Sequence, residues 1–305
     1  MAAETLKADV NEILLGYYLL GGSWKGYQDK SDVQRQLKKR QEQIGLEAYQ
    51  IQEARARIMA VDSLKWAKKN KYGSSVTKVW WTARPGILSK AVGYEVDSRK
   101  NPTDTLAQFN TKKFLGLSAK STQGKGDIGF KNPGLGTIDK ALRINLKTII
   151  DKQEDKFADT YNLSTSKSTR KREIRANKNL VEAANSGRDI TLGKVRNKFF
   201  NELKKLTQPK LKQYLLTDWM DASDGDMPPY IKVTGHGSKA PYTASILDPL
   251  KNSKMTYLAN NPIKLSKVGN DSVGVEAGGK RIMKMRVKYE SQAMASSVKF
   301  SGDPW

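Results

Sequence analysis

The spacing of apolar residues along this chain alternates between the period of a helix and the period of a strand, and this order most constrains the fold. Helical spacing comes first, strand-like segments follow, and a second helical stretch precedes strands at the end. Successive segments of this kind pack as layers of helix and sheet. The sequence therefore predicts an α+β or mixed α/β protein with a central mixed β-sheet flanked by helices.

The first 73 residues are predicted to be helical. Apolar residues recur at helical spacing in the first segment, at Leu6, Val10, Ile13, Leu14 and Tyr17. Ser31 and Gln34 have the spacing of a capping box, which predicts a long helix that ends between Asn70 and Gly73.

The middle of the chain is predicted to form strands, because β-branched and aromatic residues cluster there. The expected strands are Val76–Ala83, Val92–Val96, Thr105–Phe109 and Phe114–Ala119. Residues 110–113 between the last two suit a hairpin loop. The segment 124–136 that follows is too rich in glycine for a regular element.

The second half is predicted to contain two amphipathic helices, a basic segment and further strands. The helices are marked by apolar residues from Ile138 to Phe157 and from Leu192 to Leu206, and Ser164–Lys178 between them is polar, basic and exposed. Tyr230–Thr234 is predicted to be a strand. In a last strand Met283, Met285, Val287 and Tyr289 alternate with Lys284, Arg286 and Lys288, which indicates one buried and one basic face.

This order predicts four regions. They are an N-terminal helical region (1–73), a strand-rich core (74–160), a basic segment with helices (161–229), and C-terminal strands that complete the core or form a second lobe (230–305).

The charge of the chain points to a polyanionic partner. Lys and Arg number 54 against 31 Asp and Glu, a formal charge of +23. Nucleic acid is the commonest partner of such a surface. The sequence has no apolar run long enough to span a membrane and no secretory signal pattern, so we expect no membrane partner and a cytoplasmic location, in the host cytoplasm if the protein is viral. The absence of cysteine excludes disulfides, thiolate metal sites and cysteine nucleophiles.

Two residues in the middle region have side chains of the types that hydrolyse a phosphodiester. Asp104 opens one predicted strand and Lys120 closes the next, so pairing of the two strands would bring them together at one end of the hairpin. A carboxylate there can hold a divalent metal, and an ammonium group can orient the attacking water and offset phosphate charge. The alternative is an aspartate that only caps a turn beside an ordinary exposed lysine.

Between the helix before Trp80 and Phe130, the chain resembles the PD-(D/E)XK nuclease superfamily. Pro102-Thr103-Asp104 looks like its Pro-Asp element with one residue inserted, and Ser118-Ala119-Lys120 looks like its (Asp/Glu)-x-Lys element. The resemblance implies a restriction-endonuclease-like core, Mg²⁺ with Mn²⁺ as an alternative, and catalytic residues Asp104, Lys120 and Ser118.

Ser118 departs from the family pattern, because a hydroxyl is a poor metal ligand where the family has a second acid. Some relatives relocate this acid, and many place a Glu on the helix before the sheet. The candidate second metal ligands beside Asp104 are Glu53, Glu95, Asp97 and Asp127.

Several basic residues are candidates for contact with the nucleic-acid backbone, because lysine and arginine clusters read charge. They are Arg170, Lys171, Arg172, Arg175, Lys125 and Lys239. Lys232, Lys299 and the single histidine His236 are weaker candidates, and a surface position is the favoured interpretation for His236. Trp66, Trp80 and Trp81 are expected in the core, with a base-stacking platform as the alternative.

These observations predict a metal-dependent DNA endonuclease of the restriction, homing or phage type, which would form a homodimer if it cuts both strands. Two alternatives remain. One is a non-catalytic nucleic-acid-binding protein on the same fold, and the other is a viral structural or packaging protein that lies against a genome.

Overall fold

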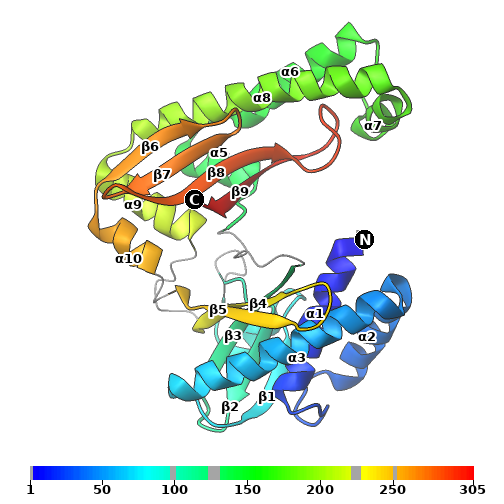
Figure 1. Ribbon diagram of the computed structural model, residues 1–305, viewed down its shortest axis with the longest axis vertical. Coiled ribbons are helices and arrows are strands. Elements are labelled where there is room, and N and C mark those ends of the chain that lie inside the picture. The colour runs from blue at the N-terminus through cyan, green and yellow to red at the C-terminus, as the bar shows by residue number, and fades with distance from the viewer. Residues whose placement is uncertain (1–2, 97–100, 123–130, 221–227, 250–252) are drawn as a thin grey trace. The chain divides into compact units, whose positions relative to one another are not determined.

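The chain forms two compact units, each built from two separate segments. The computed structural model describes residues 3–96, 101–122, 131–220, 228–249 and 253–305. Unit 1 comprises Met1–Ile128 and Ala222–Asn252, and unit 2 comprises Gly129–Asp221 and Ser253–Trp305. The predicted mixture of helix and sheet is confirmed, and each unit has its own β-sheet (Figure 1).

The described part of unit 1 combines four helices with a five-stranded sheet. Its elements are α1 (Ala3–Leu19), α2 (Lys30–Ile44), α3 (Leu46–Lys69), β1 (Val76–Trp81), α4 (Ile87–Val92), β2 (Thr105–Phe109), β3 (Phe114–Thr122), β4 (Tyr230–His236) and β5 (Thr243–Leu247). The strands lie in the order β1-β2-β3-β4-β5. Strands β3 and β4 are parallel and every other neighbouring pair is antiparallel, so the sheet is mixed.

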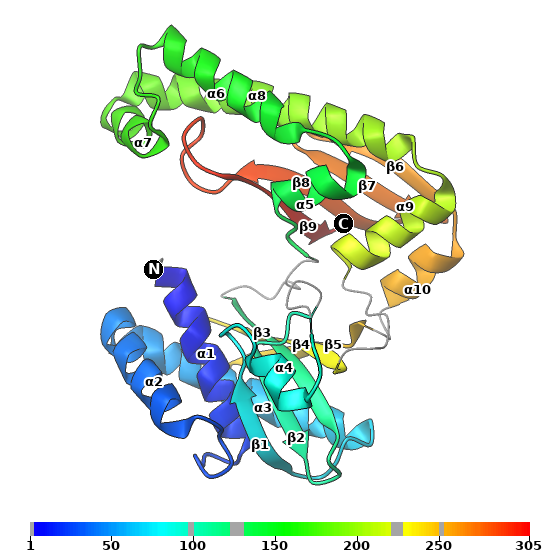
Figure 2. The same ribbon diagram turned by 180° about the vertical axis from the view of Figure 1, so that it is seen from behind.

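The two faces of this sheet have different chemistry. Alternate residues of a strand point to opposite faces. Leu115, Leu117 and Ala119 of β3 belong to the core that the sheet forms with α1 and α3. Ser118 and Lys120 therefore point to the other face. Helix α3 crosses the first face in Figure 1, and α4 covers part of the second face in Figure 2.

The predicted strands of the middle region are confirmed with one exception. The segment β1, the hairpin of β2 and β3, and the loop at 110–113 form as expected. The expected strand Val92–Val96 is wrong, because its first residue ends α4 and the rest forms a turn. Leu88 and Val96 instead pack on Leu106 of β2. These apolar residues cover the sheet and do not join it.

The expected long helix after Ser31 is wrong, because Gly45 divides it into α2 and α3. Gly45 has φ 80° and ψ 163°, a conformation that glycine adopts more easily than other residues. The capping box is also wrong. Asp29 precedes the first helical residue, Lys30, and no side chain caps this helix end.

The described part of unit 2 combines helices with a four-stranded antiparallel sheet. Its elements are α5 (Leu135–Leu142), α6 (Leu146–Thr160), α7 (Lys167–Ala176), α8 (Lys178–Lys204), α9 (Gln208–Tyr214), a π-helical turn (Leu215–Trp219), α10 (Ser253–Asn260), β6 (Ile263–Val268), β7 (Ser272–Ala277), β8 (Lys280–Tyr289) and β9 (Val298–Pro304). The strands lie in sequence order.

Helix α8 packs along one face of the second sheet, where it contacts β6, β7 and β8 (Figure 2). Aromatic rings of Phe199, Trp219 and Phe300 meet in this core, with centroids 5.0 to 6.1 Å apart. The predicted helix from Ile138 to Phe157 is two helices, because Arg143 between them adopts a left-handed conformation and Asn145 caps α6 by accepting from the backbone N–H of Thr148.

The basic segment Ser164–Lys178 differs from the predicted exposed stretch, because most of it forms α7. Arg170 and Ile174 of this helix are buried. The alternation predicted for the last strand is confirmed in β8, where Met283, Met285 and Val287 are buried and Arg286 and Lys288 are exposed.

Candidate active site

The hairpin of β2 and β3 brings Asp104 and Lys120 together, as the sequence predicted. Asp104 precedes the first residue of β2, and its backbone N–H donates to the carbonyl of Leu117 at 3.0 Å. Lys120 Nζ lies 3.2 Å from Asp104 Oδ2. The same carboxylate oxygen accepts from the backbone N–H of Ala119 at 2.9 Å. Asp104 is thus an anchored carboxylate beside an ammonium group and more than the cap of a turn.

Ser118 is fully buried next to this pair, and its hydroxyl donates to Asp104 Oδ2 over a long 3.4 Å contact. It acts here as a neighbour of the carboxylate. A serine in this position does not supply the negative charge that the second acid has in the nuclease pattern.

Glu12 on α1 is a second buried acid, whose charge interacts with that of Asp104, and the sequence analysis missed it. Its side chain is buried, and its Oε2 accepts from Trp81 Nε1 at 3.0 Å. Its backbone carbonyl accepts from Thr105 Oγ1 at 2.9 Å, which ties α1 to the residue after Asp104. Burial, and next the negative charge of Asp104, raise the pKa of Glu12 to about 8.

The pKa of Asp104 is also raised, but other groups oppose this shift. Burial raises the pKa of Asp104, while the ammonium of Lys120 and the hydrogen bonds from Lys120, Ala119 and Ser118 act in the opposite direction. A divalent cation would reduce the unfavourable free energy of ionising two buried carboxyl groups whose pKa values are raised.

A surrounding shell of side chains holds Glu12 in place. Arg40 on α2 pairs with Asp9 at 2.6 Å, and its guanidinium lies 5.1 Å from the ring centroid of Trp81. The indole of Trp81 in turn donates to Glu12. The contacts of Arg40 and Trp81 therefore orient a carboxylate that would otherwise be free to rotate.

The end of β3 beyond Lys120 is fixed by polar side chains from α3. Arg55 donates to Ser121 Oγ at 2.6 Å and to the carbonyl of Gly237 at 2.8 Å. Ser121 Oγ also donates to Gln52 Oε1 at 2.7 Å. These bonds join β3, the end of β4 and α3 directly beside the candidate site.

Lys232 on β4 adds a second lysine to the same face of the sheet. In the parallel pairing of β3 with β4 it lies opposite Ser118, and Thr234 lies opposite Lys120. Burial, and next the charge of Lys120, lower the pKa of Lys232 to about 8. His236 follows on this face, buried, with Nε2 at 2.8 Å from Ser245 Oγ, so the favoured surface position is wrong.

The other predicted acids do not join Asp104 in the described part of the chain. Glu53 accepts from Tyr18 Oη at 2.6 Å, and Tyr18 lies about 9 Å beyond Glu12 along the axis of α1. Glu95 is exposed in the turn after α4. Asp97, Asp127 and Lys125 lie outside the described residues.

The predicted nucleic-acid contacts on α7 divide into one buried and three accessible side chains. Arg170 is 2 % exposed and donates to the carbonyls of Ser164, Glu154 and Thr165, so its role is structural and its prediction as a DNA contact is wrong. Arg172 and Arg175 are exposed and Lys171 is half-buried. Lys239 is exposed in the loop between β4 and β5.

The chemistry of the donor set suits a hard cation. Within the described ranges, no group of three or more His, Cys, Asp and Glu side chains comes together to hold a metal ion. Glu12 and Asp104 nevertheless offer two carboxylates, and Mg²⁺ is commonly held by one or two carboxylates while water and substrate phosphate complete its shell. Two carboxylates are within the number that such a site uses.

Comparisons with known proteins provide no evidence for or against this site. No protein-family model matches the chain, and no curated protein matches it. Among the described residues, no helix is both long and apolar enough to cross a membrane.

Proposed function

We propose that this protein is a metal-dependent DNA endonuclease with a restriction-endonuclease-like core in unit 1. The observation that carries the proposal is the contact of Asp104 with Lys120 beside the buried carboxylate of Glu12. The five-stranded mixed sheet with α1 and α3 on one face supports the same proposal. The formal charge of +23 supports nucleic acid as the substrate.

Each residue has a role that follows from its contacts. Asp104 and Glu12 would hold the metal, and the hydrogen bonds from Ala119 and Trp81 orient the two carboxylates. Lys120, held by Asp104, would hydrogen-bond the attacking water or a phosphate oxygen. A bound Mg²⁺ would acidify the water and offset the charge that develops on the phosphate. Lys232 adds positive charge on the face where the phosphate would lie.

The proposed reaction is hydrolysis of a phosphodiester. The oxygen of water forms a bond to phosphorus, the bond from phosphorus to one sugar oxygen breaks, and the leaving oxygen takes up a proton. Two sites would be needed to cut both strands, so we propose a homodimer for double-strand cleavage.

The second candidate is a DNA-binding protein without catalysis. Ser118 at the position of the family's second acid favours it, because the described part of the chain offers two carboxylates in place of a larger ligand cluster.

A nicking assay on supercoiled DNA with Mg²⁺ tests both candidates. We expect wild-type protein to nick the DNA, Asp104→Ala and Lys120→Ala each to lose this activity while they remain folded and bind DNA, and Ser118→Ala to change it far less. Full cleavage by Asp104→Ala would overturn the proposed site. Wild-type protein that binds DNA but never cuts it, with Mg²⁺ or with Mn²⁺, would leave the non-catalytic candidate.

A further inference from the structure

The second sheet carries a row of cations on the face that α8 does not cover. Residues of β8 with even numbers point away from the core that Met283, Met285 and Val287 form. The exposed or half-exposed cations on this face, which we call the outer basic face, come from β6, β8 and β9: Lys264, Lys284, Arg286, Lys288 and Lys299. In Figure 1 the strands lie in front of α8 and α5, so this face is turned toward the viewer.

Two of the five cations on this face have an ion-pair partner. Arg286 pairs with Asp271 at 2.9 Å and Lys299 pairs with Glu290. Two further acids, Glu276 and Asp303, lie opposite Lys264 and Lys284 on neighbouring strands. In the described residues, Lys264, Lys284 and Lys288 nevertheless take part in no ion pair. These three ammonium groups are therefore available to an anionic partner, although the carboxylates of Glu276 and Asp303 reduce the net positive charge around two of them.

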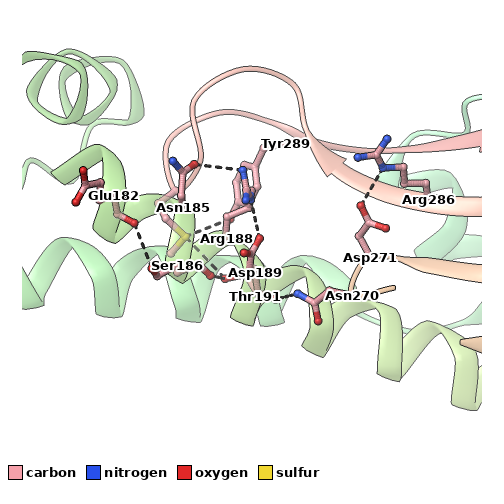
Figure 3. Close-up of polar contacts among 12 residues, drawn as sticks. Glu182, Asn185, Ser186, Arg188, Asp189, Thr191, Asn270, Asp271, Arg286 and Tyr289 are labelled. Carbon is pink, nitrogen blue, oxygen red and sulfur yellow. Dashed lines mark hydrogen bonds and ion pairs between the residues drawn. The ribbon is translucent and has the colours of Figure 1, made fainter. Parts of the chain in front are cut away.

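The strand that carries the row is anchored to its surroundings at two places (Figure 3). At one end, Tyr289 Oη donates to Met294 Sδ at 3.7 Å, and Thr191 of α8 donates to the same sulfur at 3.8 Å. Near the middle, Arg286 is held by Asp271, whose neighbour Asn270 donates to the backbone carbonyl of Asp189 on α8. The cations of β8 therefore lie on a strand that is held in place by hydrogen bonds, and not on a flexible loop.

The face also carries an aromatic ring that lies against the sheet. A Cβ at Gly274 would come within 2.6 Å of the ring of Trp305, so glycine at this position allows the ring to approach the strand. The guanidinium of Arg281 lies 4.8 Å from the centroid of the same ring. Ser266, Ser272 and Ser301 occupy positions of the same face between the cations, but Ser272 and Ser301 are buried, so the lysine and arginine side chains are the groups that reach solvent there.

This chemistry favours a nucleic-acid backbone over a lipid surface. Membrane-surface binding combines cations with apolar side chains that enter the lipid, and none of the large exposed apolar side chains of the described chain lies on β6–β9. Phosphate contacts come from lysine, arginine and serine side chains. The row from Lys284 to Lys288 spans about 14 Å at about 3.4 Å per residue, which is the length of about four nucleotides of one B-DNA strand.

We propose that the outer basic face of unit 2 binds the sugar-phosphate backbone of DNA. It contributes affinity without sequence preference, while the site in unit 1 would carry out the chemistry. This inference shares with the proposed function only the choice of DNA as ligand and does not require that the protein cuts it.

The test compares two full-length triple variants that change the net charge equally. In the first variant Lys264, Lys284 and Lys288 are replaced by Gln. In the matched control the same change is made at Lys140, Lys156 and Lys210, which are exposed on α5, α6 and α9. Binding to a short DNA duplex is measured at several salt concentrations, and thermal unfolding shows that both variants fold.

We expect the face variant to bind about tenfold or more weakly at low salt. The slope of log affinity against log salt should fall by roughly 2 to 3, since each lost phosphate contact lowers it by about 0.9. The control should stay within about threefold of wild type with an unchanged slope. An equal loss in both variants would overturn the proposal, because affinity would then follow bulk charge alone. So would unchanged DNA binding by the face variant, or wild-type binding to vesicles of anionic lipid with none to DNA.

The result is separate from the proposed reaction. Loss of binding in the face variant, together with wild-type protein that never nicks DNA, would support the surface and remove the nuclease. Normal DNA binding by the face variant together with normal nicking would remove the proposed DNA-binding surface and support the nuclease.

Discussion

Two buried charged side chains, Glu12 in unit 1 and Arg170 in unit 2, have different kinds of partner. In unit 1 the buried Glu12 lies near a second acid, Asp104, and the half-buried Lys232 lies near a second lysine, Lys120. In unit 2 the buried Arg170 donates to three backbone carbonyls, which are the partners that a guanidinium needs. Burial of charge alone therefore does not indicate a functional site. Burial of like charges side by side is unfavourable for folding, and groups with pKa values shifted in this way cluster at functional sites.

The largest effect should distinguish Glu12 from Glu53, two glutamates of unit 1. Glu12→Gln should lower Mg²⁺-dependent nicking by a factor of roughly 10² to 10³, the loss expected when one preorganised group of an active site is removed. Glu53→Gln is the matched control, because Glu53 lies on the neighbouring helix and contacts Tyr18. Single-turnover nicking rates of the two variants would measure the difference. Equal activity of both would remove Glu12 from the site.

The next effect tests whether the buried charge of unit 2 is structural. Arg170→Ala should lower the free energy of unfolding by roughly 2 to 3 kcal/mol, because buried carbonyls lose their donors. Arg172→Ala on the exposed side of the same helix should change it by less than about 0.5 kcal/mol. Urea unfolding gives both values. If the Arg170→Ala protein is instead stable but binds DNA more weakly, Arg170 contacts DNA and its role is not structural.

The smallest effect is the pH dependence of stability in Mg²⁺-free buffer. The pKa of Glu12 is about 8 in the folded protein, whereas an unperturbed glutamate has a pKa of 4.5, so between these values the folded protein holds a proton that the unfolded chain has lost. Stability should therefore be fully present below pH 4.5 and decline as pH rises through 8. The groups whose charge acts on Glu12 are Asp104, Asp9 and Lys120.

In Glu12→Gln this decline should be reduced by roughly 2 kcal/mol between about pH 5 and about pH 9, because glutamine keeps the neutral form at every pH. Urea unfolding at a series of pH values gives the two slopes, and Glu53→Gln again serves as the control. Parallel curves for wild type and Glu12→Gln would mean that Glu12 ionises normally.

Local patterns in the chain were enough to predict the hairpin at the centre of the candidate site. The strands of Asp104 and Lys120 are joined by a short loop, so their register follows from the turn, and the contact between the two side chains follows from the register. The alternation in β8 predicted a basic face in the same way. In contrast, Val92–Val96 has the composition of a strand but covers the sheet, because packing on Leu106 outweighs its weak strand preference.

Glu12 could be recognised in the sequence only as an acid within a largely apolar segment, Val10–Leu20. That pattern predicts a carboxylate that is buried at a cost in free energy, but it does not predict which residue lies beside the carboxylate. The partner is decided by the way α1 packs across β1 and β2, which brings a residue near the N-terminus to the strand that begins after Asp104.

The amino-acid sequence by itself therefore determined what depends on neighbours along the chain: the types of most elements, the Asp104–Lys120 pair and the basic face of β8. The tertiary structure alone decided which acid joins that pair, that Arg170 is buried, and that β4, more than a hundred residues after β3, lies parallel to it. The physical reason is that short-range contacts follow from the geometry of one turn or hairpin, whereas contacts between distant segments depend on how whole apolar faces are buried together.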